Sequence, residues 1–300
     1  MTECERLVRE GFLSGAFFHE EVRDDFFVDV KRKKIWAIEL DLLRQFDVFC
    51  QRHGLTYFLF VGSLLGAIRH GGFVPWDDDV DVILPRDDFE KLLKLGTEFP
   101  APYFIQTPWT DPGYWYSFPT LRNGKTSFVL RENSHLPYNH GIPLDFHPLD
   151  VWCPEEGGEK IYGEIMNLAY NNGTIMRMGN PRVGERDKAR ISGCKPANPL
   201  AACRQMREMG MTFHGRESLY VCRNTMGLYG YKRNLFWAED FRKAIPWKFE
   251  HMTLPVPIGY DRILRTLYGD YMQFPPKEKR GGWHENYIVD PDRPYTEYLE

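Results

Sequence analysis

Four aspartates lie within five residues of the chain, at Asp77, Asp78, Asp79 and Asp81, and the apolar residues 82–84 follow them directly. Carboxylates this close repel one another and raise one another's pKa values unless a cation lies against them. Oxygen ligands without neighbouring His or Cys suit Mg²⁺ or Mn²⁺ better than Zn²⁺, and Mg²⁺ commonly keeps open positions for nucleotide phosphates. The cluster therefore predicts a divalent-cation site that acts on phosphates, and a solvated acidic turn is the alternative interpretation.

The alternation of residue types after this cluster indicates which carboxylates act together. Side chains point to opposite faces of a β-strand in turn. If Val80, Val82 and Leu84 face a core, then Asp79 and Asp81 emerge together on the other face. Two oxygen ligands would then be aimed at one point, so these two aspartates are the predicted metal ligands and catalytic residues.

The segment before the aspartates has the features of a phosphate-binding turn. Residues 55–61 form an apolar run typical of a buried strand, which ends at Gly62 and Ser63 before a helix predicted over residues 64–69. Backbone N–H groups at the start of a helix carry partial positive charge and bind anions. Gly62 would allow close approach and Ser63 would add a hydroxyl donor, although such a pair is by itself more often a turn.

A third acid follows at Asp145, between apolar neighbours on a predicted short strand that prolines bound. The order of these elements is a Gly-Ser turn, a helix, a glycine-rich connection, Asp-Val-Asp-Val and a later lone strand acid. This order resembles the nucleotidyltransferase fold, in which three strand-borne carboxylates hold metal against the phosphates of a nucleotide. Asp145 is the natural third member, and the expected fold class is α+β, a mixed sheet flanked by helices.

Three stretches of the chain resemble the motifs of the LicD family, phosphocholine transferases related to the fukutin-type phosphoribitol transferases. They are GSLLGAIRHGGFVPWDDDVDVILPRDDF at residues 62–89, GIPLDFHPLD at 141–150 and LPVPIGYDRILRTLYGDYMQFPP at 254–276. The first is highly specific for the family. The resemblance brackets residues 38 to about 276, and the stretch from 155 to 245 contributes little to it.

The resemblance implies a metal-dependent transferase that moves phosphocholine from CDP-choline to a hydroxyl of a cell-surface glycan or its lipid-linked precursor, releasing CMP. It makes Asp79 and Asp81 ligands of Mg²⁺ or Mn²⁺, assigns Gly62 and Ser63 to phosphate, and places Arg69 and His70 in the same loop system, against the donor pyrophosphate. The motif records the nucleotide and the metal rather than the head group. Phosphoribitol or another phosphopolyol from a CDP donor is therefore an alternative, as is a DxD-type glycosyltransferase.

Two assignments stay open at the level of the sequence. Either Asp145 or His147, two residues along the same predicted strand, could accept the proton of the acceptor hydroxyl. Thr120 occupies a position where members of the family usually carry a lysine. Either Arg122 or Lys125 supplies that charge instead, or the donor binds differently.

The elements that must position these residues are indicated by periodicity and turn signals. An amphipathic helix is predicted from Lys31 to about Gly54, because apolar residues recur at steps of three and four, at Ile35, Ile38, Leu42, Phe46 and Phe49. Asn123-Gly124 predicts a hairpin between residues 117–121 and 126–130. We expect an N-terminal segment at 1–30, a nucleotidyltransferase-like core at 31–154 and a mainly helical part at 155–300 that completes the same catalytic unit.

Composition excludes several classes of protein. A net charge of -4 without a basic stripe argues against nucleic acid as a partner. The six cysteines are scattered without a CxxC pair, which favours free thiols in a reducing compartment. The N-terminus lacks the apolar run of a signal peptide, and no stretch reaches the roughly 18 apolar residues of a transmembrane span. The expected location is the cytoplasm, at the inner face of the membrane where a polysaccharide, teichoic acid or lipid-linked acceptor would bring the enzyme.

Overall fold

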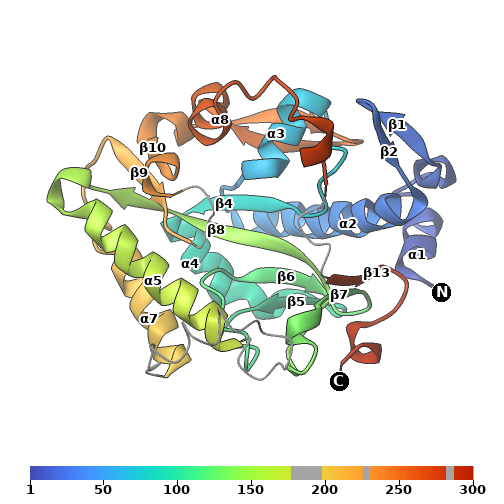
Figure 1. The fold of residues 1–300 in the computed structure, drawn as a ribbon, viewed down its shortest axis with the longest axis horizontal. Helices are drawn as coiled ribbons and strands as arrows, with labels where there is room; N and C mark the ends of the chain where they lie inside the picture. The colour runs from blue at the N-terminus through green and yellow to red at the C-terminus, as the bar shows by residue number, and fades with distance from the viewer. Residues whose placement is uncertain (177–197, 226–229, 282–286, 300) are drawn as a thin grey trace.

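The computed structural model describes residues 1–176, 198–225, 230–281 and 287–299. Its helices and strands build an α+β fold, as predicted (Figure 1). The α-helices of these residues are α1 (Glu3–Arg9), α2 (Val30–His53), α3 (Val61–His70), α4 (Arg86–Leu95), α5 (Gly158–Met176), α7 (Pro199–Gly210) and α8 (Tyr260–Tyr268). The strands are β1 (Glu21–Arg23), β2 (Phe26–Val28), β3 (Phe58–Leu59), β4 (Asp81–Pro85), β5 (Tyr103–Gln106), β6 (Thr120–Asn123), β7 (Ser127–Leu130), β8 (Ile142–Trp152), β9 (Tyr220–Arg223), β10 (Leu235–Trp237), β11 (Ala244–Phe249), β12 (Met252–Pro257) and β13 (Tyr287–Asp290).

The central sheet is mixed and has seven strands, with the order β10-β9-β8-β4-β3, while β6 pairs with both β8 and β5. Its longest strand, β8, runs through the middle of the molecule (Figure 1). β4 and β8 are parallel neighbours, and their register sets Asp81 opposite Asp145. The pairing therefore sets residues with carboxylates that are 64 positions apart in the sequence next to each other on two neighbouring strands.

Helix α2 supports this part of the sheet. Asp29 caps its start by accepting a hydrogen bond from the Arg32 N–H, and Gly54 ends it in the left-handed conformation that glycine adopts without strain. The five apolar residues of the predicted helix face are all buried, and Phe46 packs against Phe146 of β8 with ring centroids 4.7 Å apart. The predicted amphipathic helix and its buried face are confirmed.

The predicted hairpin around Asn123-Gly124 is wrong in its pairing. β6 and β7 form on either side of the turn, but β6 pairs with β5 and β8, whereas β7 pairs with β13. The Gly124 N–H donates to the carbonyl of Pro102, outside the turn. Partners that are distant in sequence have replaced the local pairing that the turn residues favour.

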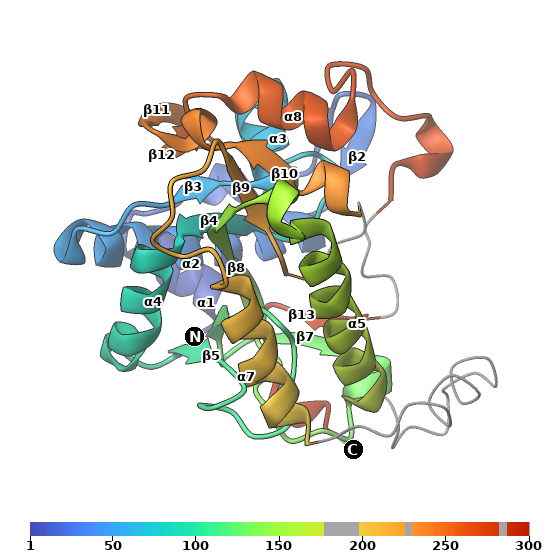
Figure 2. The same ribbon diagram turned by 90° about the vertical axis from the view of Figure 1, so that its left-hand side faces the viewer.

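The later part of the chain contains the predicted helices and additional strands. α5 and α7 pack side by side (Figure 2). No sequence pattern indicates β9 and β10, which extend the central sheet from the far edge of β8. The division of the chain at residue 154 stays a prediction.

Five of the six cysteines lie in the described residues. Cys4, Cys50, Cys153, Cys203 and Cys222 are free and buried, as the scattered spacing predicted, and Cys194 lies outside the described residues. Across the described parts of the chain, no helix combines the length and apolar character that crossing a bilayer requires.

Candidate active site

The aspartate cluster lies at the start of β4. Val80, Val82 and Leu84 are buried, whereas Asp79 and Asp81 are partly exposed, so the predicted alternation holds. β4 itself begins at Asp81, and Asp79 belongs to the irregular segment that leads into it. The Asp145 N–H donates to the Val80 carbonyl over 2.9 Å, which ties this segment to β8.

Hydrogen bonds from two helices fix the backbone of the cluster. The Ser63 hydroxyl, at the start of α3, accepts the Asp81 N–H over 2.9 Å. From α2, Arg32 Nη1 and the Trp36 indole N–H both donate to the Asp77 carbonyl, over 2.6 and 3.2 Å. Since these side chains belong to packed helices, the backbone that carries the carboxylates is held in place before any ligand binds.

The local electrostatics are strongly unfavourable for so many negative charges. Burial raises the pKa of Asp79 well above its ordinary value, and the charges of Asp77, Asp81, Asp78 and Asp145 raise it further. A carboxylate surrounded in this way is stabilised by a bound cation or by a proton. The cluster therefore has the charge character of a cation site.

His147 of β8 contacts one carboxylate of this cluster directly. Its Nε2 lies 2.8 Å from Asp81 Oδ1, and its Nδ1 lies 2.7 Å from the Thr225 hydroxyl. Burial lowers the pKa of His147, so the neutral imidazole is favoured. Asp81 can then only accept, so Nε2 carries the proton and Nδ1 accepts from Thr225. Nε2 thus holds the Asp81 carboxylate, while Nδ1 holds the ring itself against Thr225.

A cavity of about 220 Å³ opens beside the acids. Asp79 and Asp145 line it together with Thr120 and Arg122 of β6. Most of the remaining wall is aromatic and comes from the loop at 114–118, from residues 138–140 and from β7 and β13. Its rings are Tyr114, Tyr116, Phe118, Phe128, Tyr138, His140 and Tyr287. The cavity therefore combines carboxylates, one guanidinium and ring faces.

The structure distinguishes the two basic side chains that could supply a positive charge near Thr120. Arg122 is buried, lines the cavity and donates to Gln106 Oε1 over 2.7 Å and to the Gly141 carbonyl over 2.7 Å. Lys125 is 63% exposed and lies 3.4 Å from a carboxylate oxygen of Glu3. Arg122 is thus the group whose charge reaches the cavity shared with Asp79 and Asp145.

Comparison with known proteins agrees with this layout. The family model described as LicD/FKTN/FKRP, nucleotidyltransferase domain, matches residues 54–135. The lipopolysaccharide cholinephosphotransferase LicD of Haemophilus influenzae is 25% identical over 273 residues, which cover 83% of this chain and 95% of that protein. Residues 54–135 are thus similar to the LicD nucleotidyltransferase domain, and most of the chain is similar to the Haemophilus influenzae protein. An uncharacterized protein of Rickettsia prowazekii is 31% identical over 58 residues, which cover 19% of this chain and 22% of that protein.

The stretch matched by the LicD family model contains the predicted phosphate turn, and the structure gives both of its residues a local partner. Ser63 binds the backbone of Asp81. Gly62 leaves room for a carboxylate, since a Cβ built there would lie 2.4 Å from Asp77 Oδ2. These contacts explain why a small residue and a hydroxyl stand beside the acids, and their binding of donor phosphate stays a prediction.

Arg69 and His70 lie at the end of α3 and contact the C-terminal part of the chain. Arg69 Nη1 donates to the Tyr271 carbonyl over 2.6 Å, and its guanidinium lies 5.1 Å from the ring of Phe274. His70 Nδ1 lies 2.6 Å from a carboxylate oxygen of Asp24. The first and third of the three LicD-like stretches are thereby joined at α3, and the predicted contact of Arg69 and His70 with the donor stays a prediction.

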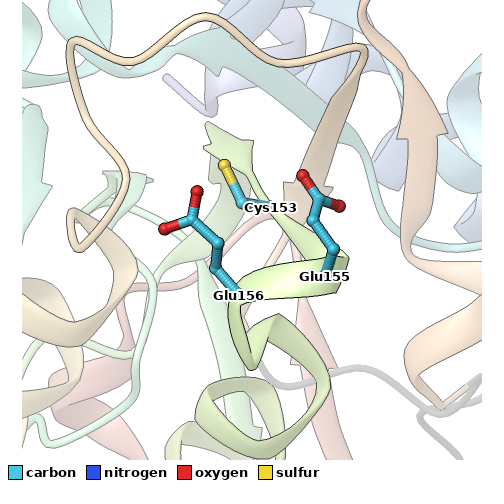
Figure 3. Close-up of side chains that lie close together, drawn as sticks. All are labelled: Cys153, Glu155 and Glu156. Atoms are coloured by element: carbon cyan, nitrogen blue, oxygen red, sulfur yellow. The ribbon is translucent and has the colours of Figure 1, made fainter.

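The tightest group of potential metal ligands in the described residues lies elsewhere. Cys153, Glu155 and Glu156, just after β8, place ligand atoms within 4.8 Å of one another (Figure 3). Glu155 and Glu156 are exposed, and Glu156 forms an ion pair with Arg216. Among the described residues, Asp79, Asp81 and Asp145 do not form so close a group; Asp81 and Asp145 are register partners, and Asp81 Oδ1 lies 2.8 Å from His147 Nε2.

Several residues of the site carry no signal in the sequence. Thr225, Tyr114, Tyr138 and Tyr287 reach it from distant segments through the sheet topology. Of the neighbouring aromatic residues Trp109, Trp115 and Tyr116, only Tyr116 lines the cavity described here. Gln106, which holds Arg122, could be found only from the pairing of β5 with β6.

Proposed function

We propose that this chain is a phosphotransferase that moves phosphocholine from CDP-choline to a hydroxyl of a glycan and releases CMP. The observation that carries the proposal is the cavity in which Asp79 and Asp145 face Arg122 between aromatic walls. The match of residues 54–135 to the LicD family model supports it, as does similarity over most of the chain to a protein named a lipopolysaccharide cholinephosphotransferase.

The residues present suit a divalent cation. All three candidate ligands offer carboxylate oxygens, the type that Mg²⁺ and Mn²⁺ prefer. Burial raises the pKa of Asp79, and the neighbouring carboxylates raise it further, so a bound cation would stabilise its charged form. Asp79 and Asp81 would hold the ion, which when bound would neutralise charge on the donor diphosphate.

The side chains of the chain itself supply the remaining requirements of phosphoryl transfer. Arg122, fixed by Gln106 and Gly141, offers a guanidinium to the phosphates of the donor. The acceptor oxygen forms a bond to phosphorus while the bond from phosphorus to the CMP oxygen breaks. Asp145 accepts the proton of the acceptor hydroxyl, because the two ring nitrogens of His147 are already hydrogen-bonded to Asp81 and Thr225.

The aromatic walls favour a cationic head group over a polyol. A trimethylammonium group binds ring faces by cation–π attraction worth about 0.5 to 2 kcal/mol per contact. Ribitol carries no positive charge and would gain no such attraction from the ring faces. Phosphoribitol transfer therefore remains the second candidate, and a DxD-type glycosyltransferase is less compatible with a carboxylate from β8 beside the pair on β4.

Donor-dependent stabilisation tests the proposal. A ligand that binds the folded state raises its stability by RT ln(1 + [L]/Kd). We expect CDP-choline with Mg²⁺ to raise the melting temperature of the purified protein, and CDP-ribitol or UDP-sugars to raise it much less. Asp81→Ala should keep the fold and lose both the shift and turnover. An equal response to CDP-ribitol would favour the phosphopolyol reaction, and a response to UDP-sugars alone would overturn the assignment.

The acceptor is proposed only as a class. The relative from Haemophilus influenzae is named for lipopolysaccharide. For this chain we propose a surface polysaccharide, a teichoic acid or a lipid-linked precursor, modified at the cytoplasmic face of the membrane. Incubation with radiolabelled CDP-choline and membrane extracts, followed by extraction of lipid-linked and polymeric glycans, would identify which of these receives the label.

A further inference from the structure

Glu39, in the middle of α2, is fully buried, and neither carboxylate oxygen has a hydrogen-bond partner among the described residues. A buried carboxylate without a partner is among the most unfavourable groups in a protein interior. Asp41, two residues along the same helix, shows the usual solution. It is equally buried, but it pairs with Arg6 over 2.5 Å and with Arg44 over 2.6 Å.

The side of α2 that carries Glu39 faces the aspartate cluster. Arg32, Trp36 and Glu39 follow one another at steps of four and three, which places them along one face of the helix. The first two donate to the Asp77 carbonyl. The charges of Asp78, Asp77 and Asp145 act on Glu39 and, together with burial, raise its pKa. The acidic site therefore extends beyond the motif at residues 77–81 to a helix that precedes it.

We propose that Glu39 is a positioning residue of the cation site, whose carboxylate supports from the α2 side the divalent cation held by Asp79 and Asp81. This inference rests on the proposed function. A cation at the cluster would offset the charge of a carboxylate for which the described residues supply no partner. A negative charge near a bound cation strengthens its binding, and more so where burial lowers the effective dielectric constant. A residue with a merely structural role would leave the affinity for the cation unchanged.

Binding of Mn²⁺ to the full chain without nucleotide tests the proposal, with the signal of free Mn²⁺ followed by electron paramagnetic resonance. We expect Glu39→Gln to weaken Mn²⁺ binding by about 10- to 100-fold while the melting temperature without metal stays close to that of the wild type. Glu39→Met, which replaces the carboxylate by an apolar chain of similar length, should weaken binding equally and raise the melting temperature without metal.

Asp41→Asn is the matched control, because it removes a buried carboxylate from the same helix outside this face. It should lower the melting temperature and leave Mn²⁺ affinity unchanged. Wild-type affinity in both Glu39 variants would overturn the inference and leave the proposed reaction standing. Loss of the fold in both would assign Glu39 a structural role. Absence of Mn²⁺ binding by the wild type would overturn the cation site itself, whether or not CDP-choline still binds.

Discussion

The imidazole of His147 joins Asp81 to Thr225, with 2.8 Å from Nε2 to Asp81 Oδ1 and 2.7 Å from Nδ1 to the Thr225 hydroxyl. All three groups lie on the central sheet or directly after one of its strands. Because each nitrogen has a defined role, the ring cannot rotate without losing both bonds. The orientation of the Asp81 carboxylate is therefore set by the strand pairing rather than by its own rotamer alone.

Replacing His147 should weaken cation binding, because its imidazole orients the Asp81 carboxylate. We expect His147→Gln to weaken Mn²⁺ binding and to lower turnover by about 10- to 100-fold, the range found when partners of metal ligands are removed. Thr225→Val should act in the same direction and less strongly. Mn²⁺ titration and steady-state kinetics would measure both. Reduced turnover with unchanged Mn²⁺ affinity would instead indicate that His147 takes the proton of the acceptor.

The two aspartates of β8 should separate catalysis from stability. Asp145→Asn is expected to lower turnover by about 10²- to 10⁴-fold, as for loss of a general base, and to change the free energy of unfolding by less than about 1 kcal/mol. Asp150 binds the Arg86 guanidinium over 2.6 and 2.7 Å in a buried pair. Asp150→Asn should therefore destabilise the fold by about 3–5 kcal/mol.

Urea unfolding and turnover of the two β8 variants provide the comparison. The Asp145→Asn variant should keep the stability of the wild type and lose turnover. The Asp150→Asn variant should lose stability and keep turnover at low temperature. Substantial turnover in Asp145→Asn would remove it from the role of base.

Arg122 should govern affinity for the donor. A charge-assisted hydrogen bond to phosphate contributes about 1.5–3 kcal/mol, so Arg122→Met is expected to weaken CDP-choline binding by about 10- to 100-fold. Lys125→Met is the control, because Lys125 is 63% exposed and its ammonium lies beside Glu3. Isothermal titration of each variant with CDP-choline and Mg²⁺ would measure the effect. A larger loss for Lys125→Met would place the donor outside the described cavity.

Stability in the absence of metal should depend on the charge of Asp79. Its pKa in the folded state lies above the unfolded value of about 3.9. The folded protein therefore binds more protons than the unfolded chain over this window, and stability falls as pH rises from about 4 through the folded pKa. Asp79→Asn cannot ionise, so its melting temperature in EDTA should exceed that of the wild type increasingly as pH rises. A gap that stays constant from pH 4 to 8 would contradict this assignment.

Local patterns predicted much of the fold, and non-local pairings account for most of what they missed. The periodicity of residues 31–54 and the helix predicted over residues 64–69 correspond to α2 and α3 of the structure. The Asn123-Gly124 turn formed, but its flanking strands paired with distant partners. Such pairings depend on packing that no single segment encodes.

The same distinction applies to the candidate site. Asp79, Asp81 and Asp145 could be proposed because their spacing follows strand alternation and a family motif. The rings of Tyr114, Tyr138 and Tyr287 could not, because only the assembled sheet brings them to one cavity. Glu39 could not be predicted for another reason, because a glutamate within a helix shows no unusual spacing in the sequence. Only its burial without a hydrogen-bond partner distinguishes it in the structure.

The pairing of β13 with β7 makes the end of the described chain part of the cavity beside the aspartates, since Tyr287 forms one of its walls. A fragment trimmed to the family-matched residues 54–135 would keep the aspartates of β4 and Arg122 but lose Asp145, Tyr138 and that wall. The smallest unit able to enclose a donor is therefore far longer than the motif by which the family is found.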